Sequence, residues 1–449
     1  MNVEKNIVVG SMVMPPGNVH LRLNAGWEKL SSLLLALVLL AVCKTTSADV
    51  LLVNEARASA VAQNPGLAEM RARYEALNEI APQKSALPDP VLTLGAMNFP
   101  WDEYDRNQEN MTQLQLGISQ LFPYPGKLGL REDIAEFEAQ AAFHSVDEMR
   151  LTLDMNVAEA WWELYFLDRS LETIERNQSL LRQFVEVAQT KYQVGKGLQQ
   201  DVLLAQLELS KVLDHRIRIQ AMRDQRRIRL NLLLGRSPNV PVTLPNMTSL
   251  PKSPSGSEAL LFQRATQSRP LLDQSRSVIK ASQSRLELAK KDYYPDFKVG
   301  VTYGDRNENE QGQSRQDFLS VKLSLNLPLF TGSKQDRAVQ QRSRELAKSQ
   351  YALTDQHNLV MSSIATALVD YQRASDQVML FDAGIIPQAR HTVESMMAGY
   401  QVNQVDFLNL VRSQVTLFNY ELQYWKSFTE VNQSIARLKA AVGEENIYE

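Results

Sequence analysis

The hydrophobic residues of this chain follow two patterns, one with the period of a helix and one with the period of a strand. Helical stretches are predicted over residues 50–83 and 257–291, and a Pro-Asp turn follows each of them. Residues 127–194 contain no proline and keep the helical pattern, which predicts one helix of roughly 100 Å at about 1.5 Å per residue. A rod of this length favours a coiled coil or the wall of a tunnel over a small globular core.

Four shorter segments have the alternation of β-strands. Residues 112–121 and 318–327 alternate most clearly, and residues 91–97 and 297–303 are their expected partners. The apolar positions that share a face are Leu114, Leu116, Ile118, Leu319, Val321, Leu323 and Leu325. A period of two over about ten residues fits a tilted membrane strand with lipid on its apolar side and a lumen on its polar side. The alternative is a soluble two-stranded ribbon with one face on a core.

Four membrane strands could not close a barrel by themselves. An open sheet edge in lipid leaves backbone groups unpaired, at a cost of several kcal/mol each. If the membrane interpretation holds, several copies of the chain must therefore assemble into one closed sheet. The polar, acidic stretches 98–111 and 305–317 then lie where external loops are expected.

One segment of the sequence recurs, in modified form, in the second half of the chain. The phrase YQVGKGLQQDVLLAQ begins at Tyr192 and YQVNQVDFLNLVRSQ begins at Tyr400, which is 400 − 192 = 208 residues later. Three other landmarks recur in the same order at similar offsets, namely Pro88 with Pro295, Pro123 with Pro328, and Gly235 with Gly443. A duplication is predicted, with repeats over residues 49–245 and 258–445 and a Pro/Ser-rich linker over residues 246–257.

The N-terminal region has the pattern of a signal peptide. Residues 30–42 form an apolar run that is too short to span a bilayer but suits a signal sequence, so residues 1–48 are predicted to be cleaved after Ala48. Cys43 closes the run and leaves two alternatives open, lipoprotein processing at this cysteine or its removal with the signal. Because no later segment approaches the roughly 20 apolar residues of a membrane helix, we expect an exported chain without a helical span.

Composition mainly excludes functions. The net charge of −3 gives no field that would steer the chain toward nucleic acid. A single cysteine excludes an internal disulfide framework, and the five histidines lack the spacing of metal ligands. The sequence has no phosphate-binding loop, no GxSxG elbow and no HExxH motif. We therefore predict no catalytic residue, no cofactor and no metal site, and no enzymatic activity.

Two conspicuous clusters are assigned to packing or solvation. The arginine-rich residues 215–229 lie on a predicted helix and are interpreted as a solvated face. Trp161 and Trp162 are interpreted as packing within or between protomers.

The tyrosine phrase, the segment QLFPYPGKL and the two strand–strand–long-helix repeats resemble the TolC family of outer-membrane efflux channels. PDPVLTLGAMNFP, PYPGKLGLR and KGLQQDVLLAQLELS resemble its heavy-metal branch, the CzcC/CusC-like proteins. The likeness covers about residues 50–443. It implies a mainly α protein with a small transmembrane β part, which forms a homotrimer with a twelve-stranded β-barrel in outer-membrane lipid and an α-helical barrel in the periplasm.

The resemblance also implies partners at the hairpin tips. A periplasmic adaptor, or membrane fusion protein, docks there, and an inner-membrane pump, of the RND type, supplies the energy. Gly195, Lys196 and Gly197 are the candidates for docking, and a turn that needs permissive backbone is the alternative. Asp201 is placed to cap or lead the returning helix, a structural role, and contact with the adaptor is the alternative.

A periplasmic gate is implied at the second tip. TolC carries two carboxylates three residues apart at positions that fall on Asn409 and Arg412 here. Asp406 lies one turn earlier and could supply a ring of three carboxylates that attracts cations. The alternative is that Asp406 only starts a helix, where an acid suits the dipole.

Three functions follow, in order of preference. The first is the outer-membrane channel of a tripartite efflux system, a passive trimeric conduit for heavy-metal cations or other small toxic solutes. The second is a protein-secretion (type I) channel of the same architecture. The third is a soluble periplasmic coiled-coil scaffold or adaptor, in which the apolar strand faces would be covered.

Overall fold

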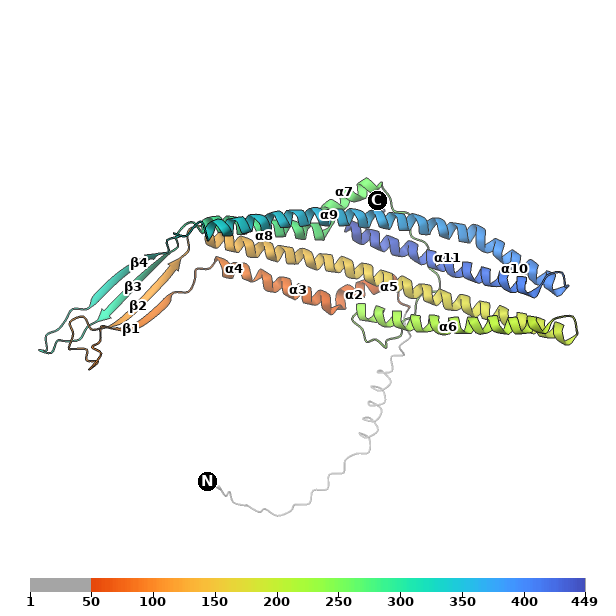
Figure 1. The fold of residues 1–449 in the computed structure, drawn as a ribbon, viewed down its shortest axis with the longest axis horizontal. Helices are drawn as coiled ribbons and strands as arrows, with labels where there is room; N and C mark the ends of the chain where they lie inside the picture. Colours follow the sequence, from red (N-terminus) through yellow and green to blue (C-terminus); the bar gives the residue numbers. More distant parts are fainter. Residues whose placement is uncertain (1–49, 449) are drawn as a thin grey trace, which may run out of the picture. The chain divides into compact units, whose positions relative to one another are not determined.

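The computed structural model describes residues 50–448 (Figure 1). The predicted signal peptide, including Cys43, lies outside the described residues. Within them, long helices run beside one another, with a sheet at one end and, at the other end, the turns that connect α5 (Lys127–Gln193) to α6 (Gln199–Leu233) and α10 (Ile386–Gln401) to α11 (Phe407–Val442) (Figure 1). No helix in this part of the chain combines the length and apolar character that crossing a bilayer requires.

The strands form one antiparallel sheet in the order β1-β2-β3-β4. Their bounds are β1 Val91–Met97, β2 Gln113–Phe122, β3 Phe297–Asp305 and β4 Phe318–Leu325. The central pair, β2 and β3, joins the two halves of the chain, with Leu116 opposite Tyr303. All four predicted strands are confirmed, with bounds that differ by at most about two residues.

The two faces of the sheet differ as the alternation predicts. The seven apolar positions named from the sequence point to one face and are 41% to 73% exposed, namely Leu114, Leu116, Ile118, Leu319, Val321, Leu323 and Leu325. A soluble ribbon would bury these side chains on a core of its own. The soluble-ribbon alternative therefore does not describe this fold.

The first repeat is built around one unbroken helix. Helix α5 spans Lys127–Gln193, 67 residues, as the absence of proline predicts. The chain then turns and returns as α6, Gln199–Leu233. Along their length, α5 and α6 pack side by side.

The second repeat carries an interruption that the first lacks. Helix α9, Gln335–Leu380, passes through a π-helical turn of five residues, Phe381–Ile385, into α10, Ile386–Gln401. Pro387 lies in the first turn of α10 and lacks the N–H that an α-helix needs, which explains the change of helical pitch. The chain returns as α11, Phe407–Val442.

The two predicted N-terminal helical stretches are each broken at a proline. The helices are α2 Val53–Gln63, α3 Pro65–Asn78, α4 Ile80–Ser85, α7 Glu258–Ser268 and α8 Pro270–Lys291. Pro65 and Pro270 are the first residues of their helices, because proline restricts the residue before it to an extended conformation. They lie 270 − 65 = 205 residues apart, so the break itself is duplicated.

In the wall, the helices of each repeat lie beside one another, and α5 joins the two repeats through its contacts with α8 and α11. Near the sheet, α3 and α4 pack on α5, α5 packs on α8, and α8 packs on α9; toward the turns, α6 packs on α5, α5 on α11, and α11 on α9 and α10. An aromatic cluster fills the middle, where the rings of Trp161 and Tyr165 stack 5.6 Å apart and Trp162 lies 6.2 Å from Phe428. Both tryptophans are buried within the protomer, as packing residues.

The arginine-rich segment of α6 is only partly a solvated face. Arg223 forms an ion pair with Asp168 of α5, and Arg226 pairs with Glu163 at 2.8 Å. The prediction is therefore wrong for these arginines, because α5 presents carboxylates at the matching height. Arg216 and Arg229 remain exposed, as predicted.

Candidate functional site

The two hairpin tips have the same backbone turn. Gly195 in the first tip and Asn403 in the second have positive φ values of 69° and 64°. The hydrogen bonds that close the turns match as well, running from Lys196 N to Lys191 O (2.8 Å) and from Gln404 N to Gly399 O (2.9 Å). This is the Schellman motif, in which a left-handed residue ends a helix. Asn403 is a residue type that tolerates this conformation without being glycine.

In each tip, a close contact between the end of the first helix and the residue after the turn requires a glycine. The glycine is the residue after the turn in the first tip and the helix residue in the second tip. A Cβ at Gly197 would lie 2.9 Å from the Lys191 Cβ. In the second tip the equivalent contact is reversed, and a Cβ at Gly399 would lie 2.6 Å from Val405 Cγ2. The alternative interpretation of Gly197, a turn that needs permissive backbone, is thus part of the geometry. Lys196 stays exposed at the end of the tip and is accessible to a partner.

The tips are joined to each other through Tyr400. The Lys191 ammonium donates a hydrogen bond to the Tyr400 carbonyl and lies 4.1 Å from the centre of the tyrosine ring. The Tyr400 hydroxyl donates to Asp201 Oδ2 at 3.3 Å. Burial and the Asp201 carboxylate raise the pKa of Tyr400 to about 12, so the phenol keeps its proton at neutral pH. Asp201 is in the first turn of α6, where the sequence placed it.

This joint was not predicted, although the sequence shows both tyrosines. Tyr192, which stands at the position equivalent to Tyr400, is 48% exposed, whereas Tyr400 is 4% exposed. The positions equivalent to Lys191 and Asp201 are Gly399 and Asn409, so the second tip lacks both charged partners. Among the described residues, the contacts with a lysine and an aspartate therefore form around Tyr400 and not around Tyr192.

The candidate gate residues lie together on α11. Asp406 is the N-cap of this helix and makes no capping hydrogen bond with its side chain. Asp406, Asn409 and Arg412 follow one another at a spacing of three residues, and all three are exposed. Asp406 thus does start a helix, as the alternative interpretation states, while its carboxylate stays available to solvent.

At the base of the sheet, a buried lysine holds the repeats together. Lys127, the first residue of α5, is 3% exposed and lies 3.1 Å from Asp292 and 3.0 Å from Asp296. Both carboxylates belong to the connection between α8 and β3. Its equivalent, Gln335, begins α9 and is also buried, but contacts the Asp292 carbonyl through its amide at 3.3 Å.

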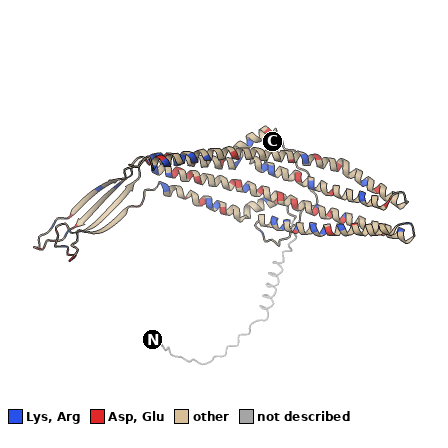
Figure 2. Cartoon of the chain, in the orientation of Figure 1, with Lys and Arg blue, Asp and Glu red and all other residues tan. Residues whose placement is uncertain are grey.

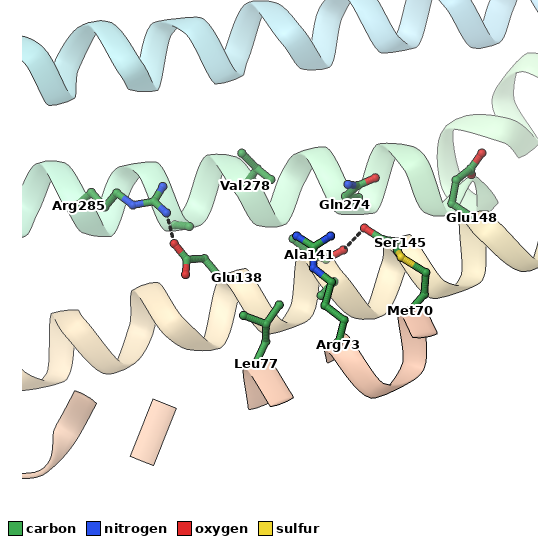
Figure 3. A pocket seen from close by; sticks show the side chains of 12 residues that line it. Met70, Arg73, Leu77, Glu138, Ala141, Ser145, Glu148, Gln274, Val278 and Arg285 are labelled. Carbon is green, nitrogen blue, oxygen red and sulfur yellow. Dashed lines mark hydrogen bonds and ion pairs between the residues drawn. The ribbon is translucent and has the colours of Figure 1, made fainter. Parts of the chain in front are cut away.

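A cavity of about 510 Å³ lies in the wall between α3, α5 and α8 (Figure 3). Arg285 pairs with Glu138 at one end, and Glu148 lies at the other, 2.5 Å from Arg269. Glu148 also accepts the backbone N–H of Leu271, and burial raises the pKa of its carboxyl while burial lowers the pKa of Arg269. With these charges paired, the cavity has no free acid–base pair. Within residues 50–448, no group of three His, Cys, Asp or Glu side chains is arranged to hold a metal.

The sequence profile of the family described as outer membrane efflux protein matches this chain twice, over residues 56–236 and 261–444. The chain is 21% identical to outer membrane protein TolC of Vibrio cholerae over 388 residues, which cover 84% of this chain and 88% of that protein. It is 20% identical to cobalt-zinc-cadmium resistance protein CzcC of Cupriavidus metallidurans, over 71% of this chain and 74% of that protein. It is also 20% identical to alkaline protease secretion protein AprF of Pseudomonas aeruginosa, over 71% of this chain and 69% of that protein.

Solved structures have the same fold. The outer-membrane channel OprN matches with a TM-score of 0.76 at 17% identity, over 88% of this chain and 91% of that chain. CusC matches with a TM-score of 0.74 at 15% identity, over 87% of this chain and 92% of that chain. The tandem-repeat, mainly helical architecture predicted from the sequence is therefore confirmed.

Proposed function

The chain belongs to the outer membrane efflux protein family, and from this premise we propose that it is the outer-membrane channel of a tripartite efflux system. Three copies form one passive conduit from the periplasm to the exterior. A periplasmic adaptor and an inner-membrane pump, of the RND type, complete the system, and the channel itself performs no catalysis.

The observation that carries this proposal is an unfinished sheet with an exposed apolar face. Among the residues that the structure describes, strands β1 and β4 each have only one neighbour, so each leaves an edge of unpaired N–H and C=O groups. In lipid such groups cost several kcal/mol each. Pairing β4 of one copy with β1 of the next removes both edges, and three copies give 3 × 4 = 12 strands. The exposed leucines and valines then face lipid.

The duplication supplies a register for this pairing between copies. Within one chain, Ser119 of β2 is opposite Gly300 of β3. The offset of 205 residues between Pro123 and Pro328 makes Ser324 the equivalent of Ser119. The offset of 207 residues between Pro88 and Pro295 makes Thr93 the equivalent of Gly300. We therefore infer that Ser324 of one copy lies opposite Thr93 of its neighbour.

The tips provide the periplasmic end of the conduit. Lys196 is exposed at the end of the first tip, which supports adaptor docking at Gly195, Lys196 and Gly197. Asp406, Asn409 and Arg412 form an exposed strip on α11, and in a trimer three copies of this strip surround one axis. The Asp406 carboxylates then form the ring that controls passage.

The cargo consists of heavy-metal cations or other small toxic solutes. The similarity to CzcC, whose name records cobalt, zinc and cadmium resistance, supports the metal assignment. The similarity to AprF, named for alkaline protease secretion, favours the second candidate, a type I secretion channel. A soluble scaffold, the third, does not account for the exposed apolar face of the sheet.

Two measurements test the proposal. Light scattering of the detergent-extracted protein is expected to give the mass of a trimer. Deletion of the chain is expected to lower tolerance to metals, with restoration by the intact gene. A monomer that stays soluble without detergent would contradict the channel assignment. Unchanged tolerance to all metals, together with loss of protease export, would instead support the type I secretion channel.

A further inference from the structure

The polar face of the sheet carries positive charge only. Among the strand residues on this face, Lys298 of β3 and Lys322 of β4 are the charged ones. Figure 2 shows the strands almost free of charged residues, in contrast to the helices and the loops beyond the strands. Lys322 is opposite Gly300, and Lys298 is opposite Ser324, so the two lysines lie on neighbouring strands at adjacent positions of the same face.

The two ammonium groups have no partner within residues 50–448, since neither takes part in an ion pair or a hydrogen bond there. The carboxylates at the ends of β3 and before β4 are already engaged. Asp317, which precedes β4, accepts hydrogen bonds from the Tyr303 hydroxyl and the Arg306 backbone N–H. Asp296 is bound by Lys127 at 3.0 Å, and Asp305 points to the other face and pairs with Arg106 at 2.6 Å. The positive charge on this face is therefore not neutralised by the protomer.

The surroundings of the lysines suit an oxyanion. A hollow of about 250 Å³ lies on this face, and both lysines line it. Hydroxyl and amide groups also line it, from Thr93, Gln115, Ser119, Thr302 and Ser324, and Ile118 is the apolar residue of the lining. Gly117 and Gly300 also line it and add no side chain of their own. Ammonium groups with neutral donors around them bind small anions through charge-assisted hydrogen bonds.

We propose that this face is an anion-binding site for small oxyanions or carboxylates, three copies of which line the barrel. The inference rests on the proposed function, because the face surrounds a lumen only in the closed trimer. Anionic solutes, and metal ions carried as complexes with anionic ligands, fit such a lumen. Because six lysines, two from each of three copies, repel a bare metal cation, the inference narrows the proposed metal cargo to cations that pass this face as complexes with anionic ligands.

A structural role explains only one of the two lysines. Lysine on an edge strand prevents unwanted pairing, and Lys322 is on the edge strand β4. Lys298 is on β3, which has a neighbour on both sides. Edge protection therefore does not account for the pair.

The test uses a cysteine at Ser119, in the lining of the hollow, and one at Leu116, which is exposed on the opposite face and does not line the hollow. Outer-membrane vesicles that contain the full protein are treated with a sulfonate-bearing and with a trimethylammonium-bearing methanethiosulfonate reagent. For Ser119→Cys, we compare the rate of modification by the sulfonate reagent with the rate of modification by the trimethylammonium reagent. The ratio of the first rate to the second is expected to fall about fivefold when Lys298→Gln and Lys322→Gln are added. Sulfate is expected to slow the anionic reagent more than chloride does at equal ionic strength, only with both lysines present.

The controls separate this inference from the proposed function. Lys252→Gln, an exposed lysine of the linker, is expected to leave the ratio unchanged. If Ser119→Cys reacts with neither reagent, or no faster than Leu116→Cys, the face is not in a water-filled lumen and the proposed function fails. If Ser119→Cys reacts but the double lysine variant keeps the same ratio, the channel stands and the anion site is rejected.

Discussion

The Tyr400 hydroxyl in the second repeat donates a hydrogen bond to Asp201 in the first, over 3.3 Å. The same tyrosine lies under the Lys191 ammonium, so a residue of one tip is held by two charged residues of the other. Because the two tips are long helical hairpins anchored at the opposite end, this joint fixes their separation. We therefore expect the joint to limit how far the tips of one protomer spread.

Removing the hydroxyl should loosen the tips. Tyr400→Phe loses one hydrogen bond to a charged group, roughly 1.5–3 kcal/mol, while the ring still packs on Phe407, 5.0 Å away. We expect a higher single-channel conductance in planar bilayers. Tyr192→Phe is the matched control, since Tyr192 is exposed and is expected to conduct like the parent. Equal conductance in all three proteins would show that the joint does not restrict the opening.

The reversed glycine contact predicts a rescue. Gly399→Ala places a methyl group against Val405 Cγ2 and is expected to cost about 1–3 kcal/mol by overpacking. Adding Val405→Gly gives the second tip the arrangement of the first and should recover most of the lost melting temperature. Gly129→Ala, where no atom lies within 4 Å of the new Cβ, is expected to be harmless. Additive losses in the double variant would contradict the contact.

The ion pair beside the wall cavity predicts a pH-dependent loss. Arg269→Met leaves the Glu148 carboxylate without its partner and should lower the free energy of unfolding by about 3 kcal/mol at neutral pH. Burial already raises the pKa of Glu148, and loss of Arg269 raises it further. A carboxyl group whose pKa is higher in the folded state than in the unfolded state stabilises the fold at pH values below the unfolded pKa. This stabilisation is lost as the pH rises through the folded pKa. The deficit measured by thermal unfolding should therefore be larger at pH 8 than at pH 5.

Two further variants separate this charge effect from lost packing. Glu148→Gln in the Arg269→Met background should remove most of the pH dependence. Arg342→Met breaks an exposed pair with Glu345 on one helix and is expected to cost less than about 1 kcal/mol. A deficit of the same size at both pH values would indicate packing alone.

The proposed gate ring predicts contact between copies. If three Asp406 residues surround one axis, Asp406→Cys should form disulfide-linked dimers when the trimer is oxidised. Asp214→Cys, exposed midway along α6, should remain unlinked. Equal cross-linking at both positions would place Asp406 away from the axis.

Local patterns in the sequence were sufficient to predict the strands, their two faces and the long helix α5. The breaks at Pro65 and Pro270 were missed because the helical periodicity continues on both sides of each proline. The joint at Tyr400 was missed for a different reason. Lys191 and Tyr400 are 400 − 191 = 209 residues apart, and the duplication makes both tips look alike, so only packing decides which tyrosine is buried.

The central claim is that neighbouring copies complete the sheet, with Ser324 of one copy opposite Thr93 of the next. The most direct measurement is oxidative cross-linking of the chain carrying Thr93→Cys and Ser324→Cys, extracted from outer membranes. Covalent dimers and trimers are expected, whereas Thr93→Cys with Ser320→Cys, roughly 13 Å out of register at about 3.3 Å per residue, should stay monomeric. Disulfides that form only within single chains, or no disulfide in either pair, would contradict the account.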